Sequence, residues 1–272
     1  MNALARARAN EIIKKYGLKI PWQFKFEEIL NAERLLLEEK ALDGAMGLLV
    51  FNKNGGIITV NENIKEITQK RFTIAHELGH FVNEKDKVNT TTINEMGKGQ
   101  LQDAEIIYKC GFDELYGMKR ESKLEYDANE FAGELLIPSK ELKSFIKGKK
   151  LDLKLLKETA VYFNVSLCVS AIKTAETDFI PCAAVMTTDG SVKWVKISKS
   201  FPYQFIRTGE KVSELSYVHD YYNGKEFPIE GEDVPASAWF REDFKLRKDD
   251  RLFEMNIAMP SYNSMLTILK EE

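Results

Sequence analysis

The sequence predicts an α+β protein in three parts: helices on a small sheet over residues 1–140, a short helical segment at 141–177 and a β-rich module at 178–272. Three observations lead to this prediction. Apolar residues recur at helical spacing in two long stretches of the first part. Short apolar runs separated by turn residues precede them. After Asp178 the pattern changes to short β-like runs, so we place boundaries near residues 140 and 178.

The predicted sheet of the first part comes from apolar runs at residues 33–40, 45–51 and 57–60. The last two flank NKNGG (52–56), in which asparagine and glycine can supply the positive φ that a tight hairpin needs. A small, mostly antiparallel sheet is therefore expected.

The helices of the first part are predicted from amphipathic spacing. A polar stretch at 86–100 is expected to follow the end of the helix at 66–81. Residues 101–117 look weakly helical. Pro138 is expected to stop the fourth. The four helices are placed at residues 3–16, 24–32, 66–81 and 122–136.

The remaining chain is predicted from its turn signals. Asn164-Val165-Ser166 separates two helical stretches, and Asp189-Gly190 is a hairpin signal between the runs IPCAAVMT and SVKWVKI. Further strands are expected at FPIE (227–230), PASAWF (235–240), RLFEMNIAM (251–259) and SMLTILK (264–270).

Composition excludes several classes of protein. With 44% hydrophobic and 30% charged residues, the chain is not wholly disordered, and its net charge of −3 does not favour nucleic-acid binding through the overall field. It has no run of eighteen apolar residues and no apolar N-terminal region, so neither a membrane span nor a secretory signal is expected. Cys110, Cys168 and Cys182 lie far apart without CxxC spacing, which predicts inert thiols, no disulfide framework and a cytoplasmic location.

One pentapeptide contains two candidate metal ligands and a candidate general base. His76-Glu77-Leu78-Gly79-His80 is an H-E-x-x-H pattern within a predicted helix, where positions four apart share one face and can bind one metal ion. Glu77, offset by roughly 100°, is placed to act as general base on a water molecule at the metal. The pattern predicts a catalytic zinc site with three protein ligands and an open position. Whether Mn²⁺ can replace Zn²⁺ is left open.

The third ligand is expected from the next strong helix. No further histidine follows at a suitable spacing and the cysteines are poorly placed, so a carboxylate is the default, and Glu125 is chosen. Asn129, one turn later on the same face, is expected to hold a zinc-binding imidazole by its other nitrogen.

Three other carboxylates lie on or beside that helix. Glu121 shares the face of Glu125 but sits at the helix start, where a carboxylate more often serves the helix dipole. Asp127 and Glu130 are expected to face solvent, because the apolar stripe of the helix must face the core.

Two segments together resemble the ImmA/IrrE family of zinc metallopeptidases. They are RFTIAHELGHFV (71–82), preceded by GLLVFNKNGGIITVN (47–61), and EYDANEFAGELLIP (125–138). The resemblance covers residues 1–140 and implies a zincin-like fold and a gluzincin-like endopeptidase. Characterised members cleave a helix-turn-helix transcriptional repressor and release a stress or mobile-element programme. The span 81–124 looks longer than in the family and is interpreted as an insertion, a candidate lid or substrate-docking element.

Two weaker signals concern the rest of the chain. Residues 151–175 resemble the helix-turn-helix-like segment that follows the peptidase domain in some family members. Residues 139–176 hold eight lysines against four acidic residues, which suits phosphate. Few base-reading side chains are present, however, so a packing or substrate-orienting role is favoured over direct nucleic-acid binding. His219, beside Tyr217, Tyr221 and Tyr222, lies in the β-rich part and is expected to make no contact with zinc.

The leading hypothesis is thus a cytoplasmic zinc-dependent endopeptidase with His76, His80 and Glu125 as ligands, Glu77 as base and a helix-turn-helix repressor as substrate. The alternative is a regulator that binds DNA or a repressor through residues 139–176 and holds a purely structural zinc. A third reading is a partner-sequestering protein on an inactive scaffold, against which the intact Glu77 argues. The oligomeric state stays open.

Overall fold

A computed structural model of the chain describes residues 3–19, 25–94, 106–111 and 123–271. For residues 86–94 it describes the backbone only. By internal packing the chain forms two compact units. The first comprises Met1–Pro138 and Tyr162–Ser166, and the second Ser139–Val161 and Leu167–Glu272.

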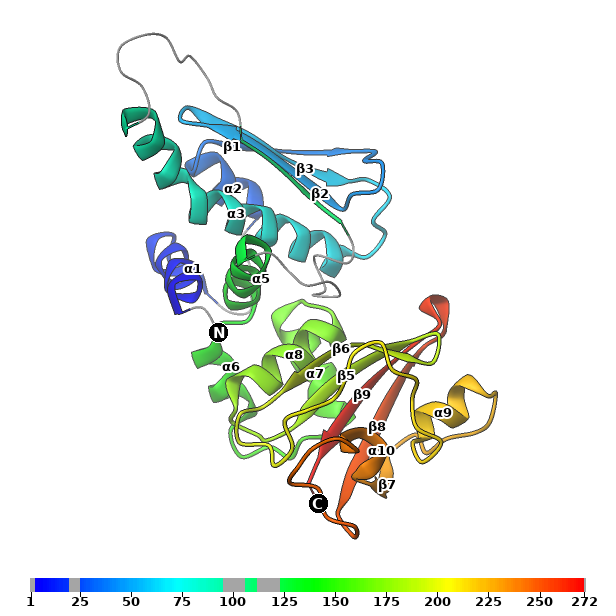
Figure 1. Cartoon of the computed structure of the whole chain (residues 1–272). Helices are drawn as coiled ribbons and strands as arrows, with labels where there is room; N and C mark the ends of the chain where they lie inside the picture. The colour runs from blue at the N-terminus through cyan, green and yellow to red at the C-terminus, as the bar shows by residue number, and fades with distance from the viewer. Residues whose placement is uncertain (1–2, 20–24, 95–105, 112–122, 272) are drawn as a thin grey trace. The chain divides into compact units, whose positions relative to one another are not determined.

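A four-stranded mixed sheet forms one layer of the first unit (Figure 1). Its order is β1-β3-β2-β4, in which β1 runs parallel to β3 and the other neighbours are antiparallel. The sheet is mostly antiparallel, as predicted, and the one parallel pair arises because β3 of the hairpin inserts between β1 and β2. The strands are β1 (Leu35–Lys40), β2 (Gly47–Asn52), β3 (Gly55–Asn61) and β4 (Ile106–Cys110).

Strand β4 corrects the weakly helical interpretation of residues 101–117. It pairs with β2 in antiparallel register, Gly47 opposite Cys110 and Phe51 opposite Ile106. Ile107 is 62% exposed while Cys110 is fully buried, so the side chains alternate between solvent and core as in a half-buried strand. Part of the span interpreted as an insertion therefore belongs to the sheet, and its residues 95–105 and 112–122 lie outside the described chain.

Helix α3 lies between the sheet and two further helices, α1 and α5 (Figure 1). It continues to Asn94, well past its predicted end, because polar residues without glycine or proline do not stop a helix. The other helices begin and end close to the predicted positions. The helices of this unit are α1 (Ala3–Lys15), α2 (Phe26–Ala32), α3 (Ile67–Asn94) and α5 (Lys123–Leu136).

The close approach of α3 and α5 depends on Gly79. A Cβ atom at this position would lie 3.1 Å from the Ala128 carbonyl oxygen and 3.1 Å from the ring of Phe131. Ala128, Phe131, Ala132 and Leu135 are fully buried, which confirms the predicted apolar stripe of α5. This contact holds the first turn of α5 near the H-E-x-x-H segment.

The opposite side of α5 is covered by α1, so the prediction that Glu130 faces solvent is wrong. Glu130 is buried, and its Oε2 accepts a hydrogen bond from Arg6 Nε at 2.7 Å. A buried carboxylate needs such a partner, and α1 supplies it. Asp127, by contrast, is partly exposed.

The second unit contains a five-stranded antiparallel sheet of order β6-β5-β9-β8-β7. Asp189 and Gly190 both have positive φ and join β5 to β6, which confirms the predicted hairpin. Its elements are α6 (Ser139–Ile146), most of α7 (Leu153–Phe163), α8 (Leu167–Thr177), β5 (Ala183–Thr188), β6 (Ser191–Ile197), α9 (Tyr217–Tyr222), β7 (Glu232–Pro235), α10 (Ser237–Phe240), β8 (Arg251–Met259), the 3₁₀ turn Pro260–Tyr262 and β9 (Ser264–Lys270).

Two predicted strands of this unit are wrong. Residues 227–230 form no strand, and 235–240 form the end of β7 and the helical turn α10. The turn buries Trp239, whose indole N–H donates to the buried carboxylate of Glu254 at 2.7 Å. A helical turn reaches this partner, and the predicted pattern of apolar residues did not distinguish it from a strand.

Among the described residues, no single helix has the length and hydropathy needed to cross a membrane. Helices α7 and α8 reach that threshold only when taken together, across a bend of 105°.

Candidate metal centre

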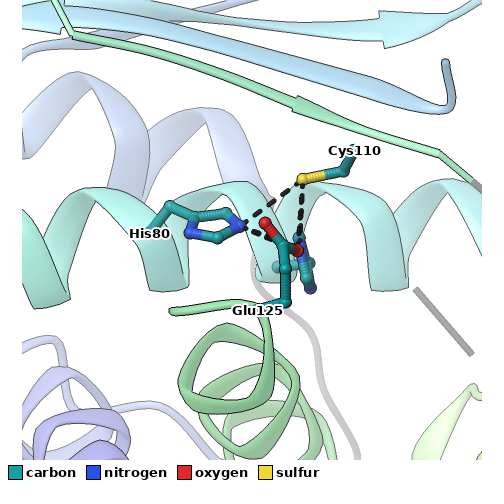
Figure 2. A group of neighbouring side chains, drawn as sticks. His80, Cys110 and Glu125 are labelled. Carbon is teal, nitrogen blue, oxygen red and sulfur yellow. Dashed lines mark hydrogen bonds and ion pairs between the residues drawn. The ribbon is translucent and has the colours of Figure 1, made fainter. Parts of the chain in front are cut away.

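Three elements of the first unit converge on one point (Figure 2). Helix α3 contributes His76 and His80, which lie one turn apart and project from one face. Glu125 comes from the first turn of α5, and Cys110 is the last residue of β4. The structure thus brings together the three predicted ligands and Cys110, a cysteine whose sequence position had indicated no metal ligand.

The four candidate donor atoms lie at the corners of a nearly regular tetrahedron. His76 Nε2 lies 3.0 Å from His80 Nε2, 3.1 Å from Glu125 Oε2 and 3.1 Å from Cys110 Sγ. The other three separations are 3.3 Å between His80 Nε2 and Glu125 Oε2, 3.4 Å between His80 Nε2 and Cys110 Sγ, and 3.7 Å between Cys110 Sγ and Glu125 Oε2. Such converging nitrogen, oxygen and sulfur donors fit one metal ion.

Burial and charge suit a cation at this point. His76, His80 and Cys110 are essentially inaccessible to solvent, and Glu125 is mostly buried. Burial alone would raise the pKa of Glu125, but the adjacent imidazoles of His76 and His80 hold that pKa well below its ordinary value. The carboxylate is therefore charged throughout the neutral range. His76, His80 and Glu125 form a metal-binding group.

Unlike the Glu125 carboxylate, the Cys110 thiol is protonated while no metal is bound. Burial, together with the carboxylates of Glu77 and Glu125, raises the pKa of this thiol far above its ordinary value. A coordinated cation reverses that preference, because a thiol bound to a metal is deprotonated outright.

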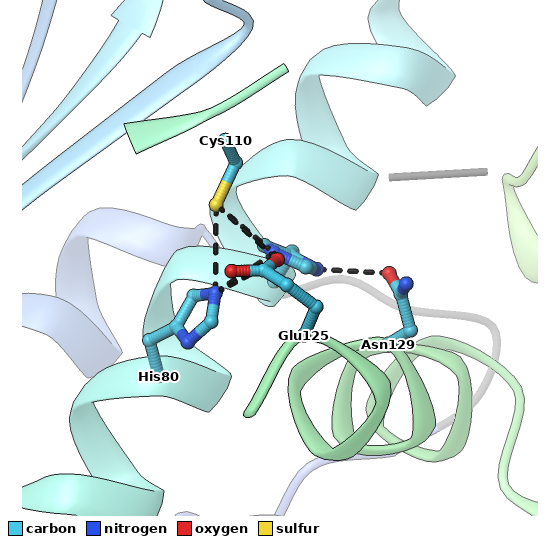
Figure 3. A network of polar contacts seen from close by, with 5 residues as sticks. His80, Cys110, Glu125 and Asn129 are labelled. Atoms are coloured by element: carbon cyan, nitrogen blue, oxygen red, sulfur yellow. Dashed lines mark hydrogen bonds and ion pairs between the residues drawn. The ribbon is translucent and has the colours of Figure 1, made fainter. Parts of the chain in front are cut away.

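Asn129 fixes one imidazole from behind (Figure 3). Its Oδ1 lies 2.9 Å from His76 Nδ1, and an amide oxygen can only accept. Nδ1 of His76 therefore carries the proton, which leaves the lone pair of Nε2 directed at the other donors. Such an outer partner orients the ring and raises its basicity as a ligand.

Glu77 is fully buried beside this group and is not one of the four donors. Neither of its carboxylate oxygens accepts a hydrogen bond of ordinary geometry from the described residues, although the Cys110 thiol lies next to it. Burial raises the pKa of Glu77 to about 7, and nearby His76 partly opposes that rise. A carboxylate with this pKa can both accept and release a proton near neutral pH.

Gly47 on β2 makes room for Glu77. A Cβ atom at Gly47 would lie 2.8 Å from Thr73 Cγ2 and closer still to a carboxylate oxygen of Glu77. Both neighbours belong to α3, so a side chain here must displace Glu77 or push the sheet away from the helix.

We therefore expect Gly47→Ala to reduce any activity that depends on Glu77 by about tenfold or more, and to lower the free energy of unfolding by about 1–3 kcal/mol through overpacking. Urea denaturation and a rate measurement on the same preparations check this. Val50→Ala, on the other face of the same strand, is the matched control. Equal rates for Gly47→Ala and wild type would show that Glu77 does not need this space.

Two residues of the centre were missed at the level of sequence. They are Cys110 and Tyr108, which lie two positions apart on β4 and therefore share the face of the strand that turns to α3. The Tyr108 ring stacks on that of His80, with centroids 4.4 Å apart. The alternation in Ile106-Ile107-Tyr108-Lys109-Cys110 was the available signal. Cys168 and Cys182 are free thiols outside this group, as expected.

Comparison with known proteins places this geometry in a family. The profile of the IrrE N-terminal-like domain, peptidase family M78, matches residues 35–174, which is half of the chain and includes all four donors. The chain belongs to this family. Metallopeptidase ImmA of Bacillus subtilis (strain 168) is 28% identical over 174 residues, which are 62% of this chain and 83% of ImmA. The protein is accordingly an M78-family metallopeptidase related to ImmA.

The M78 match runs from β1 to α8, so the helices at 141–177 lie largely within the matched region. A solved structure, a Mycobacterium tuberculosis transcriptional regulator, has a similar fold with a TM-score of 0.55 and 13% identity, over 99% of this chain and 77% of that one. At this identity the likeness concerns the fold alone. His219 lies on α9 in the second unit, where its Nε2 is 3.1 Å from Asn223 Nδ2.

Proposed function

We propose that this protein is a zinc-dependent endopeptidase that cleaves a helix-turn-helix transcriptional repressor in the cytoplasm. The observation that carries the proposal is the buried carboxylate of Glu77, which lies beside three metal donors and accepts no hydrogen bond of ordinary geometry from the described residues. A buried carboxylate without a hydrogen bond destabilises the fold. A purely structural metal site does not need such a carboxylate, whereas a catalytic site does.

Each side chain of the site then has a chemical role. Zinc held by His76, His80 and Glu125 would supply Lewis-acid polarisation of a peptide carbonyl and a lowered pKa for water. Glu77 accepts the proton of the attacking water and delivers it to the leaving amine nitrogen, so that the peptide C–N bond breaks. Asn129 keeps the His76 ring in its binding orientation.

The proposed substrate class is based on sequence similarity to other members of the family. The family resemblance implies repressor cleavage, and the identity with ImmA supports the peptidase part. Together they favour a role in stress response or mobile-element control.

The test is to incubate the zinc-loaded protein with a helix-turn-helix repressor encoded beside its gene and to analyse the products by mass spectrometry. We expect cleavage at a defined peptide bond, lost after chelation and restored by added zinc. A repressor that stays intact with one equivalent of zinc bound, both to the wild-type protein and to a Cys110→Ala variant, would count against this substrate class.

A second function is supported by the fourth donor, since closed four-donor sites are typical of structural zinc. In that case the chain would be a regulator that binds DNA or a repressor through the lysine-rich residues 139–176. An electrophoretic shift with operator DNA that survives chelation and falls steeply with salt would favour this function.

A further inference from the structure

Cys110 Sγ lies 3.1, 3.4 and 3.7 Å from the other three candidate donor atoms, near the separations expected in a zinc tetrahedron. With Zn–N distances of about 2.0–2.1 Å and Zn–S of about 2.3 Å, a regular tetrahedron has edges of about 3.4 Å between nitrogen or oxygen donors and about 3.6 Å to sulfur. The six separations among the four donor atoms run from 3.0 to 3.7 Å. The shortest joins the two nitrogens and the longest joins sulfur to oxygen, while His76 Nε2 lies only 3.1 Å from Cys110 Sγ, so metal binding needs the donors to move apart by a few tenths of an ångström.

The pairing of β4 with β2 brings the sulfur to this point. Cys110 faces Gly47 in the register of β4 and β2, and its carbonyl oxygen accepts a hydrogen bond from Met46 N at 2.8 Å. Because Gly47 has no side chain, the space over α3 is left to the Cys110 thiol and the Glu77 carboxylate. The buried carboxylate of Glu77 accepts no hydrogen bond of ordinary geometry from the described residues, which is a second sign that something else binds at this point.

We propose that the Cys110 thiolate is a fourth metal ligand that holds the site closed, and that it must leave before an external molecule can reach the metal. On metal binding the S–H bond breaks, the proton passes to solvent and a sulfur–metal bond forms. Four protein donors fill a tetrahedron, whereas a catalytic site keeps one position open. The consequence for peptide cleavage rests on the proposed function, but the metal chemistry does not.

The position of Cys110 suits a ligand that comes and goes. His76, His80 and Glu125 are set in long helices packed against each other, while Cys110 ends a five-residue strand that in the described chain pairs with β2 only. Withdrawal of the end of β4 removes the sulfur without moving the other three donors.

The experiment uses the full chain loaded with Co²⁺ in place of Zn²⁺, and azide as the external ligand. Wild type should show a sulfur-to-cobalt charge-transfer band in the near ultraviolet. Cys110→Ala and Cys110→Ser should lose the band, retain one bound Co²⁺ at saturating metal and bind azide at least about tenfold more tightly. Cys168→Ala, a change to a thiol outside the site, should match wild type.

Two results would overturn the inference: a wild-type spectrum without the band, or equal azide affinity in wild type and both variants. Circular dichroism checks that the variants fold, and the serine variant keeps the side-chain volume. At equal bound zinc, Cys110→Ala should cleave the repressor at least about tenfold faster than wild type. The band and the azide difference in variants that cleave nothing would support the ligand assignment and count against the proposed function.

Discussion

Replacing Glu77 with glutamine is expected to abolish repressor cleavage while leaving the bound zinc in place. Glutamine has nearly the same shape, so it fits the space over Gly47, but it does not take up a proton. Loss of a general base typically costs about 10²–10⁴-fold in rate. Because Glu77 is not among the four donors, zinc content should stay near one equivalent. Cleavage rate and zinc content are measured on the same purified samples.

The matched control is Glu66→Gln, an exposed carboxylate just before α3. It changes the charge of the protein by the same amount and should cleave like wild type. If Glu77→Gln with zinc bound cleaved as fast as this control, the proposed mechanism would be wrong.

Replacing Glu125 with alanine should lower zinc affinity at least tenfold and abolish cleavage. Even outer partners of metal ligands typically cost about 10–100-fold in affinity, and Glu125 contributes a donor atom itself. Its removal also takes away the one permanent anion among the three predicted ligands. Zinc titration of the metal-free variant, followed by metal analysis at saturation, measures the effect.

Asp127→Ala is the control for this variant, since Asp127 belongs to the same turn of α5 and is partly exposed. It should keep zinc near one equivalent. Glu121→Ala is expected to do the same, although Glu121 lies outside the described residues. Full zinc occupancy in Glu125→Ala would remove Glu125 from the site.

Those parts of the site that depend on one helix at a time were predictable from sequence. The spacing of His76 and His80 fixes their common face, and the apolar stripe of α5 leaves Glu125 and Asn129 beside it. Local periodicity determines both, so no knowledge of the tertiary fold was needed.

Cys110 was not predictable in this way. It becomes a metal donor because β4 pairs with β2 and ends directly over α3, and such pairing between distant segments leaves little trace in five residues of sequence. Its distance along the chain from either histidine matches no common cysteine motif. The sheet, rather than spacing, brings the sulfur to the metal group.

The burial of Glu130 was likewise not predictable from the pattern of its own helix. The amphipathic pattern of α5 predicts one buried face, but α1 covers the other face and Arg6 pairs with the carboxylate there. Packing of a third element overrode the amphipathic pattern. In the second unit a strand was predicted at 235–240 from its apolar composition, but residues 237–240 form the helical turn α10, and composition alone does not distinguish the two.

The most direct test of this account is to titrate zinc into the metal-free wild-type protein and to measure bound zinc and cleaved repressor in the same samples. Cleavage should rise in proportion to bound zinc and level off at one equivalent, and a His76→Ala/His80→Ala variant should neither hold zinc at this site nor cleave. Cleavage that is independent of bound zinc, or full zinc binding by that double variant, would contradict the account.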